Sequence, residues 1–270
     1  AVNGRGYKLA QNIILLDSNE ILNHIYQVKL DSLNVSLSET STNSVLLEQK
    51  NTGQLNALIT EHQSSGRGRR GKVWVSPIAK NIYMSLCTTT DELTPDHASL
   101  SIQTGLAVAS VLKQYIPSIK VKWPNDLWVN QHKLGGILVD IKVQADGSFK
   151  IVFGLGLNVN VLNALEKVDQ PWTSICQLLG QELNRNILAA QLIDACGQCL
   201  TKPNSDFTRW NEFDALESRS VNVLSASDQK PPCYGSAMGI NHLGNLLVQV
   251  EGEKTPRELT GGEVSIRVKQ

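Results

Sequence analysis

The chain has 270 residues, of which 41% are hydrophobic, and its 25 Lys and Arg residues balance 25 Asp and Glu residues. This length allows one large domain or two unequal ones, and the composition suits an ordinary folded core rather than a disordered chain. Because the formal net charge is +0, no overall field attracts nucleic acid or an anionic membrane, and any basic function must be local.

Two further features restrict the class of protein. The longest uncharged stretch, Pro231 to Val250, contains glycines, asparagines and a histidine, so it does not suit a membrane span. The 5 cysteines are odd in number and scattered, which predicts reduced thiols and a cytoplasmic location. Cys196 and Cys199 form a lone C-x-x-C pair; zinc would need a second pair, so structural thiols are favoured over a redox or metal role.

The order of elements predicts a mixed domain followed by a small all-β module. Ser41-Thr42-Asn43 suits a helix N-cap, and Thr94-Pro95-Asp96 suits a helix start. The first part predicts helix, turn, strand and helix within 13–60, a strand at 55–61, a loop at 63–72, strand segments from Val73 to Met84 and a helix from Thr94 to Tyr115. Strands at 120–123 and 127–129, a hairpin of 137–143 and 149–157, and helices at 186–200 and 207–216 follow. From Ser220 onward, alternating residues predict strands at 221–223, 246–250 and 264–268. We place a domain boundary near 216–219.

The strongest local motif is the run Gly-Arg-Gly-Arg-Arg-Gly-Lys at 66–72. Glycine lets backbone N–H groups approach a ligand, and arginine presents a planar fork that matches phosphate. The run is neither a Walker A motif nor a dinucleotide-binding fingerprint, because a strand rather than a helix is predicted after it. Phosphate binding is therefore favoured; RNA or DNA contact and a flexible solvated loop stay open, although net neutrality argues against nucleic acid.

Three other motifs each allow a functional and a structural interpretation. Lys-Trp-Pro-Asn-Asp at 122–126 gathers an ammonium, an amide and a carboxylate, although turn chemistry also explains Pro-Asn-Asp. Lys-Leu-Gly-Gly at 133–136 places a lysine at the mouth of a buried strand, where bulge glycines are the alternative. Gly-Leu-Gly-Leu-Asn at 154–158 leaves one sheet face bare, for a flat ligand or for close packing.

The sequence offers cations, backbone groups and one carboxylate, with no obvious nucleophile. It has no Gly-x-Ser-x-Gly elbow and no His-Glu-x-x-His, and its 5 histidines show no metal-binding spacing, so we predict no protein-held metal. This inventory fits group transfer from a nucleotide, where positioning and charge neutralisation do most of the catalysis.

Taken together, the motifs at 41–43, 66–71, 122–126, 133–138 and 154–158 resemble those of the biotin protein ligases in order and spacing, over essentially the whole chain. Gly-Gly-Glu-Val-Ser-Ile-Arg at 261–267 resembles the end of that family's C-terminal barrel. The resemblance implies an α+β protein with a class II aminoacyl-tRNA synthetase-like mixed-sheet catalytic domain at 10–216 and an SH3-like β-barrel at 217–270. Residues 1–9 resemble the last strand of a winged-helix domain, so we expect a ligase core from a longer bifunctional ligase and biotin-operon repressor, without specific operator binding by this chain.

The resemblance also implies a reaction in two steps. The biotin carboxylate attacks the α-phosphate of Mg-ATP to give biotinyl-5′-AMP and pyrophosphate. A lysine of the biotin carboxyl carrier protein of acetyl-CoA carboxylase then attacks this adenylate and releases AMP. The expected cofactors are ATP and Mg²⁺, and the strand at 137–143 suits sheet extension across a two-fold axis in a homodimer.

Residue roles follow from the same resemblance. The catalytic residues would be Arg69, Lys133 and Asp126. Biotin would be held by Ser41, Thr42, Asn43, Gln63, Gly66, Arg67, Gly68, Arg69, Lys133 and Gly136. The nucleotide would be held by Arg70, Trp74, Lys122, Asn125, Asn158, Trp172 and Arg267. The family often has arginine where this chain has Lys72, so a point charge replaces a fork there and a bidentate contact is in doubt.

Electrostatics supports this division of roles. A carboxylate approaches a nucleotide only if cations offset the repulsion, and two unit charges about 4 Å apart interact by roughly 4 kcal/mol at an effective dielectric constant near 20. In the second step only about 0.1% of an ordinary lysine is neutral near neutral pH. We expect Asp126 to orient this amine, because an ordinary carboxylate is a weak base.

Three alternative functions compete with this interpretation. A lipoate–protein ligase shares the fold and chemistry, although the residues of the motifs at 66–71 and 122–126 favour biotin. An adenylate-sensing transcriptional regulator would need a DNA-binding part, and its contacts would show a steep salt dependence. A non-catalytic biotin-binding module would lack biotin-dependent ATP–pyrophosphate exchange.

Overall fold

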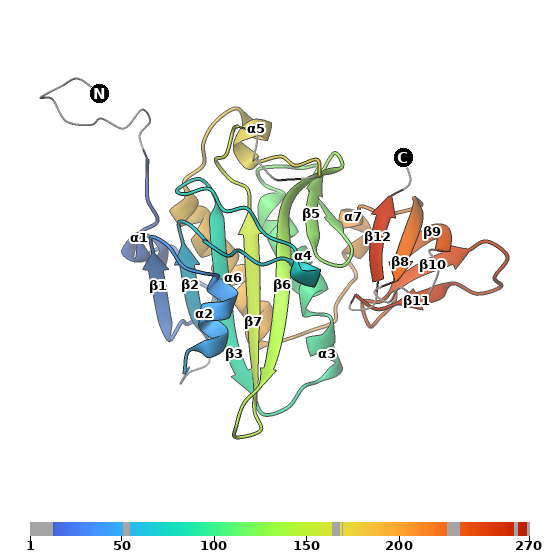
Figure 1. Ribbon diagram of the computed structural model, residues 1–270, viewed down its shortest axis with the longest axis horizontal. Coiled ribbons are helices and arrows are strands. Elements are labelled where there is room, and N and C mark those ends of the chain that lie inside the picture. Colours follow the sequence, from blue (N-terminus) through green and yellow to red (C-terminus); the bar gives the residue numbers. More distant parts are fainter. Residues whose placement is uncertain are drawn as a thin grey trace, which may run out of the picture.

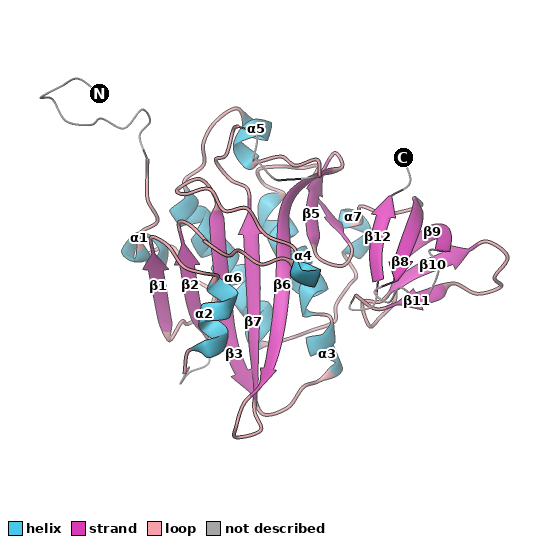
Figure 2. Cartoon of the chain, in the orientation of Figure 1, coloured by secondary structure: helices cyan, strands magenta, loops and turns pink. Residues whose placement is uncertain are grey.

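The structure is a computed structural model that describes residues 13–50, 55–163, 168, 170–225, 233–261 and 264–268. Two β-sheets dominate it, a large mixed sheet and a smaller antiparallel sheet beside it (Figure 1; Figure 2). The residues expected to be a winged-helix remnant, 1–9, lie outside the described residues. None of the helices in the described segments is both long and apolar enough to cross a lipid bilayer.

The large sheet has seven strands whose spatial order differs from their order in the chain. Strands β1 and β2 are parallel, and the other neighbouring pairs are antiparallel. From edge to edge the strands are β1 (Ser32–Ser36), β2 (Asn56–Thr60), β3 (Ile82–Thr90), β7 (Phe149–Leu157), β6 (His132–Val143), β5 (Asp126–Val129) and β4 (Lys120–Lys122).

The two long helices cover one face of this sheet, whereas α2 (Thr42–Glu48) lies on the other (Figure 1). The long helices α4 (Leu100–Leu112) and α6 (Arg185–Thr201) pack on each other and on one face, and α2 contacts the opposite face over β2, β3 and β7. Strands β2 and β3 are buried along nearly their whole length, as expected for strands covered on both faces. The other helical elements are α1 (Ser18–Leu22), η1 (Arg69–Gly71), α3 (Pro95–Ala98), α5 (Ile175–Leu179) and α7 (Trp210–Phe213).

The smaller sheet contains five antiparallel strands and touches the turn before β5. The indole N–H of Trp123 donates a 2.9 Å hydrogen bond to the carbonyl of Gly244. The strands, from edge to edge, are β11 (Arg257–Leu259), β10 (Leu246–Val250), β9 (Cys233–Ile240), β8 (Ser220–Ser225) and β12 (Val264–Val268). The domain limits at 216 and 217 stay predictions; the first strand of this sheet begins at Ser220.

Several predicted elements are confirmed. The strand at 55–61, the strands around the Trp-Pro-Asn-Asp turn, the 137–143/149–157 hairpin and the helix at 186–200 correspond to β2, β4 and β5, β6 and β7, and α6. Both cysteines of the C-x-x-C pair lie on α6, where burial raises the pKa of Cys199 to about 11 and that of Cys196 well above its ordinary value. This burial supports the structural role predicted for these thiols.

Other predictions are wrong in detail. Residues 73–75 form no strand, because Trp74 N–H bonds back to Gly66 within the loop. The helix predicted from Thr94 to Tyr115 breaks at Ser99, which leaves the right-handed helical region at ψ 7°. The helix predicted at 207–216 is only α7, since the carboxylate of Asp214 accepts hydrogen bonds from Trp210 Nε1 and Leu216 N–H and ends it.

Candidate functional site

The floor of the candidate site is the sheet face where the glycines of β6 and β7 leave room for other side chains. A Cβ atom at Gly154 would overlap with the carboxamide of Asn43, and one at Gly156 would overlap with the indole of Trp74. A Cβ atom at Gly136 would lie 3.3 Å from the same indole. The bare strand face therefore receives α2 and Trp74 directly.

The start of α2 is fixed by buried polar contacts. Ser41 is the N-cap but makes no side-chain capping bond, so the predicted cap position is confirmed without its expected bond. Thr42 N–H donates a 3.0 Å bond to Oε1 of Gln63. Ser85 of β3 donates from Oγ to Oδ1 of Asn43 at 2.6 Å, and its Oγ lies 2.7 Å from Oγ1 of Thr42. The predicted residues Thr42, Asn43 and Gln63 thus meet in one network.

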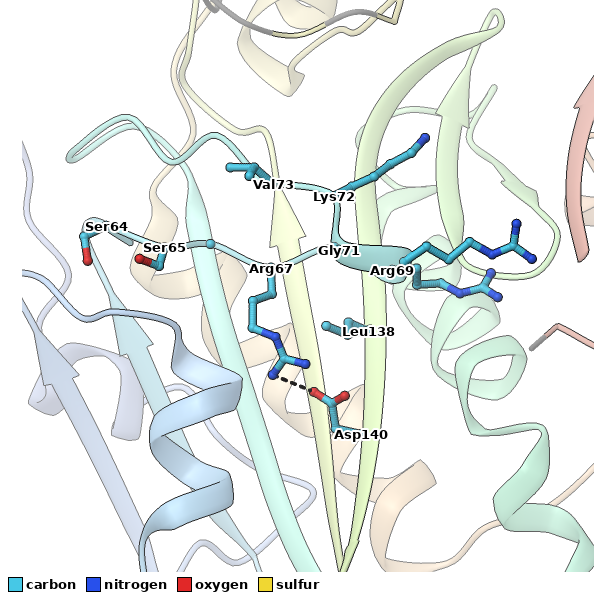
Figure 3. A pocket seen from close by; sticks show the side chains of 12 residues that line it. Ser64, Ser65, Arg67, Arg69, Gly71, Lys72, Val73, Leu138 and Asp140 are labelled. Atoms are coloured by element: carbon cyan, nitrogen blue, oxygen red, sulfur yellow. Dashed lines mark hydrogen bonds and ion pairs between the residues drawn. The ribbon is translucent and has the colours of Figure 1, made fainter. Parts of the chain in front are cut away.

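The arginine-rich loop arches over this face and lines a solvent-open pocket of about 600 Å³ (Figure 3). Gly66 has no space for a side chain, because a Cβ atom would overlap with the carbonyl oxygen of Trp74. Arg70 and Gly71 adopt positive φ angles of 57° and 70°, which turn the chain back toward β3. The pocket is lined by Ser64, Ser65, Gly66, Arg67, Gly68, Arg69, Arg70, Gly71, Lys72, Val73, Leu138 and Asp140.

The second arginine of the loop joins the loop to both sheets. Arg69 donates from Nη1 to Oδ1 of Asn125 at 3.2 Å and from Nη2 to the carbonyl of Gly261. Asn125 itself donates a 2.7 Å bond to the carbonyl of Ile137. Burial, followed by the charge of Arg70, lowers the pKa of Arg69. The guanidinium is thus held at the meeting point of the loop, the Trp-Pro-Asn-Asp turn and the smaller sheet.

Lys133 and Asp126 form the ion pair at the centre of the site. Nζ of Lys133 lies 2.8 Å from Oδ1 of Asp126, and both side chains are less than one fifth exposed. The same ammonium lies 5.5 Å from the ring centroid of Trp74. The predicted catalytic residues Lys133 and Asp126 are therefore in direct contact, beside the glycine floor.

A second lysine lies on the same sheet face. Nζ of Lys122 is 4.3 Å from the ring centroid of Trp128. The pKa of Lys122 is lowered mainly by burial, with further lowering by Lys133 and Lys72 that the charge of Asp126 opposes. Cations from three separate motifs thus converge around one carboxylate, which suits the binding of an anionic ligand larger than a single phosphate.

Three predicted nucleotide residues lie away from this centre or serve it indirectly. Asn158 is buried, donates to the carbonyl of Thr173 at 3.1 Å and accepts from Asn81 at 3.2 Å, so its amide positions the end of β7. Trp172 forms a backbone bridge beside Lys133. Arg267 lies exposed on β12 and acts on Lys122 through its charge, whereas the neighbouring positions 262 and 263 fall outside the described residues.

The sequence analysis missed Ser85, Asp140 and Trp128. Ser85 and Asp140 each interrupt an apolar strand segment, Ile-Tyr-Met-Ser-Leu and Ile-Leu-Val-Asp-Ile, and a lone polar residue in such a run was the available signal. Trp128 carried no such signal, because aromatic residues are common in strands.

Comparisons with known proteins give one consistent result. The model of the Biotin/lipoate A/B protein ligase family matches residues 35–158. The bifunctional ligase/repressor BirA of Salmonella typhimurium is 34% identical over 278 residues, which cover 98% of this chain and 83% of that protein. The biotin–[acetyl-CoA-carboxylase] ligase of Mycobacterium tuberculosis is 34% identical over 172 residues, or 60% of this chain and 61% of that protein. The fold resembles that of the biotin protein ligase from Aquifex aeolicus in complex with biotin and ATP, with a TM-score of 0.71, 23% identity, and coverage of 89% of this chain and 100% of that one.

Proposed function

The chain belongs to the biotin protein ligase family, and from this premise we propose that it activates biotin with ATP and transfers the biotinyl group to a lysine of a biotin carboxyl carrier protein. The observation that supports this most is the meeting of Lys133, Asp126 and Trp74 beside the glycine floor, with Arg69 held close by through Asn125. We infer further that the two sheets represent a class II aminoacyl-tRNA synthetase-like domain, 10–216, and an SH3-like barrel, 217–270.

In the first step, an oxygen of the biotin carboxylate attacks the α-phosphorus of ATP, the bond to the bridging oxygen breaks, and pyrophosphate leaves. Two anions must approach each other, and the ammonium of Lys133 and the guanidinium of Arg69 offset this repulsion. Lys133 is held ready by Asp126 at 2.8 Å and exchanges this partner for the substrate. The arginine loop closes over the adenylate and shields it from water.

In the second step, the lysine amine of the carrier attacks the acyl carbon, the bond to the AMP oxygen breaks, and AMP leaves. Once Lys133 has turned to the substrate, the carboxylate of Asp126 is free to orient the incoming amine. Mg²⁺ would enter with the nucleotide, as part of Mg-ATP, because Mg²⁺ in nucleotide sites keeps several waters and is bound largely by the substrate phosphates.

A homodimer of this chain would use the distal half of β6. Strand β5 pairs with β6 only as far as Gly136. Beyond it, the backbone of Ile137 still bonds with Asn125, and the carbonyl of Leu138 accepts from Asn43, so among the described residues 139–143 pairs on one side alone, with β7. Ile141 and Val143 are 43% and 64% exposed there. A free edge with exposed apolar side chains supports the predicted sheet extension, in which a second copy pairs along this edge. The repressor role of a longer protein and the cytoplasmic location stay predictions.

Biotin-dependent ATP–pyrophosphate exchange tests the proposal directly. We expect exchange with biotin and Mg-ATP, little exchange with lipoate, and biotin transfer to a carrier protein. Calorimetry with biotin and then lipoate, with and without Mg-ATP, separates a biotin ligase from a lipoate ligase. Biotin binding without exchange would instead identify a binding module, and no binding of either acid would contradict the proposal.

A further inference from the structure

The carboxylate of Asp140 lies in the wall of the arginine-loop pocket and faces Arg67 (Figure 3). It also contacts Asn43. Its Oδ2 atom accepts a 2.9 Å hydrogen bond from Nδ2 of Asn43 and lies 3.4 Å from Nη1 of Arg67. Among the pocket-lining residues in the described part of the chain, Asp140 is the one acidic side chain, and the lining also includes three arginines and Lys72. The negative charge of Asp140 would repel an anionic ligand in this pocket, so its presence calls for a physical explanation.

The two contacts of Asp140 differ in how easily they break. Asn43 is 4% exposed, and one N–H of its amide donates to the carbonyl of Leu138 at 3.2 Å. The loss of Asp140 would therefore leave the other N–H of this buried amide unsatisfied. The side chain of Arg67 is 44% exposed, and its contact with Asp140 involves one nitrogen at 3.4 Å. Exposed ion pairs of this kind are weak. Arg67 can therefore leave while Asp140 stays bound to α2.

We propose that Asp140 is a positioning residue that holds Arg67 over the pocket as its counter-ion until the carboxylate of the incoming biotin replaces it. This inference rests on the proposed function. In this exchange Arg67 keeps one carboxylate partner throughout, while Asp140 keeps its hydrogen bond from Asn43. Arg67 also lies 3.3 Å from Oγ of Ser44, on α2, so the arginine starts beside the helix that carries Thr42 and Asn43.

Two substitutions at this position separate the two contacts. Asp140→Asn keeps an oxygen that accepts from Asn43 but removes the charge that competes for Arg67. We expect biotin to bind about two- to fivefold tighter, because an exposed ion pair of this strength no longer has to be broken. Biotin methyl ester, which lacks the carboxylate, should bind with unchanged affinity. Asp140→Ala removes both contacts and should weaken the binding of both ligands.

Calorimetry of the parent and the two variants with each ligand decides the matter, with thermal unfolding as the check on folding. The proposed exchange of Arg67 between Asp140 and biotin would be overturned if the Asp140→Asn variant bound biotin as tightly as the parent or more weakly. It would also be overturned if the affinities for biotin and for its ester changed by the same factor. Arg67→Gln provides an independent test, since it should weaken biotin much more than the ester; equal losses would also overturn it. If the parent binds no biotin, the proposed function itself fails.

Discussion

Replacing Asp126 with asparagine should slow transfer to the carrier far more than adenylation. In the resting site, Asp126 lies 2.8 Å from Lys133, a separation at which two unit charges attract by about 6 kcal/mol at an effective dielectric constant near 20. Asparagine keeps the shape and one acceptor oxygen but removes the charge. In adenylation Lys133 leaves Asp126 for the substrate in any case, and it keeps its own charge and its contact with Trp74, so adenylation should slow by less than about threefold.

The transfer step loses the charged acceptor that orients the incoming amine. A hydrogen bond to a charged group contributes about 1.5–3 kcal/mol, which corresponds to a transfer rate about 10- to 100-fold slower. Single-turnover measurements with supplied biotinyl-5′-AMP and carrier report transfer alone, and ATP–pyrophosphate exchange reports adenylation alone. Asp91→Asn, an exposed change in the turn after β3, is the matched control. Equal slowing of both half-reactions would refute the role given to Asp126.

Three other outcomes are expected. Arg69→Gly removes the contacts with Asn125 and Gly261, so the adenylate should escape and label lysines of bystander proteins; retention of the adenylate as in the parent would contradict closure of the arginine loop over it. Arg185→Met leaves the buried carboxylate of Glu61, now 2.5 Å from the guanidinium, without its charged partner and should lower the free energy of unfolding by about 3–5 kcal/mol in urea denaturation. Arg185→Met with Glu61→Leu should recover only part of this loss, because the N–H of Leu16 and the carbonyl of Asn81 also lose their partners. Nucleotide binding should take up protons at alkaline pH, because the lowered pKa of Lys122 rises toward its ordinary value of 10.5 beside phosphates; calorimetry in buffers of different ionisation enthalpy should show an uptake that Lys122→Met abolishes.

Much of the large sheet could be predicted, because its strands carry local signals. The Trp-Pro-Asn-Asp turn and the Ala-Asp-Gly turn each separate apolar runs, and both give antiparallel pairs in the structure. Strand β9 was missed because its residues, Cys233–Ile240, include two glycines and a serine, and its pairing with β8 and β10 decides its conformation. The residue pattern within one segment does not reveal which other strands it will pair with.

The candidate site was predictable where motifs are contiguous and unpredictable where the sheet joins distant residues. The resemblance supplied the loop, Lys133 and Asp126, but no spacing in the sequence says that Lys133 pairs with Asp126 or that Trp74 covers Gly156. Ser85 reaches α2 only because β3 lies under it. Such contacts arise from strand order and register, which depend on the whole fold.

The bond from Arg69 to the carbonyl of Gly261 spans 192 positions of the chain. The resting place of the arginine loop is therefore set partly by a strand connection of the smaller sheet, and Gly261, the described residue that accepts this bond, does not line the pocket. Sequence drift in that distant connection could make the ligase leakier or more retentive toward its reactive intermediate while every pocket residue stayed the same, so fidelity is encoded partly at the far end of the polypeptide.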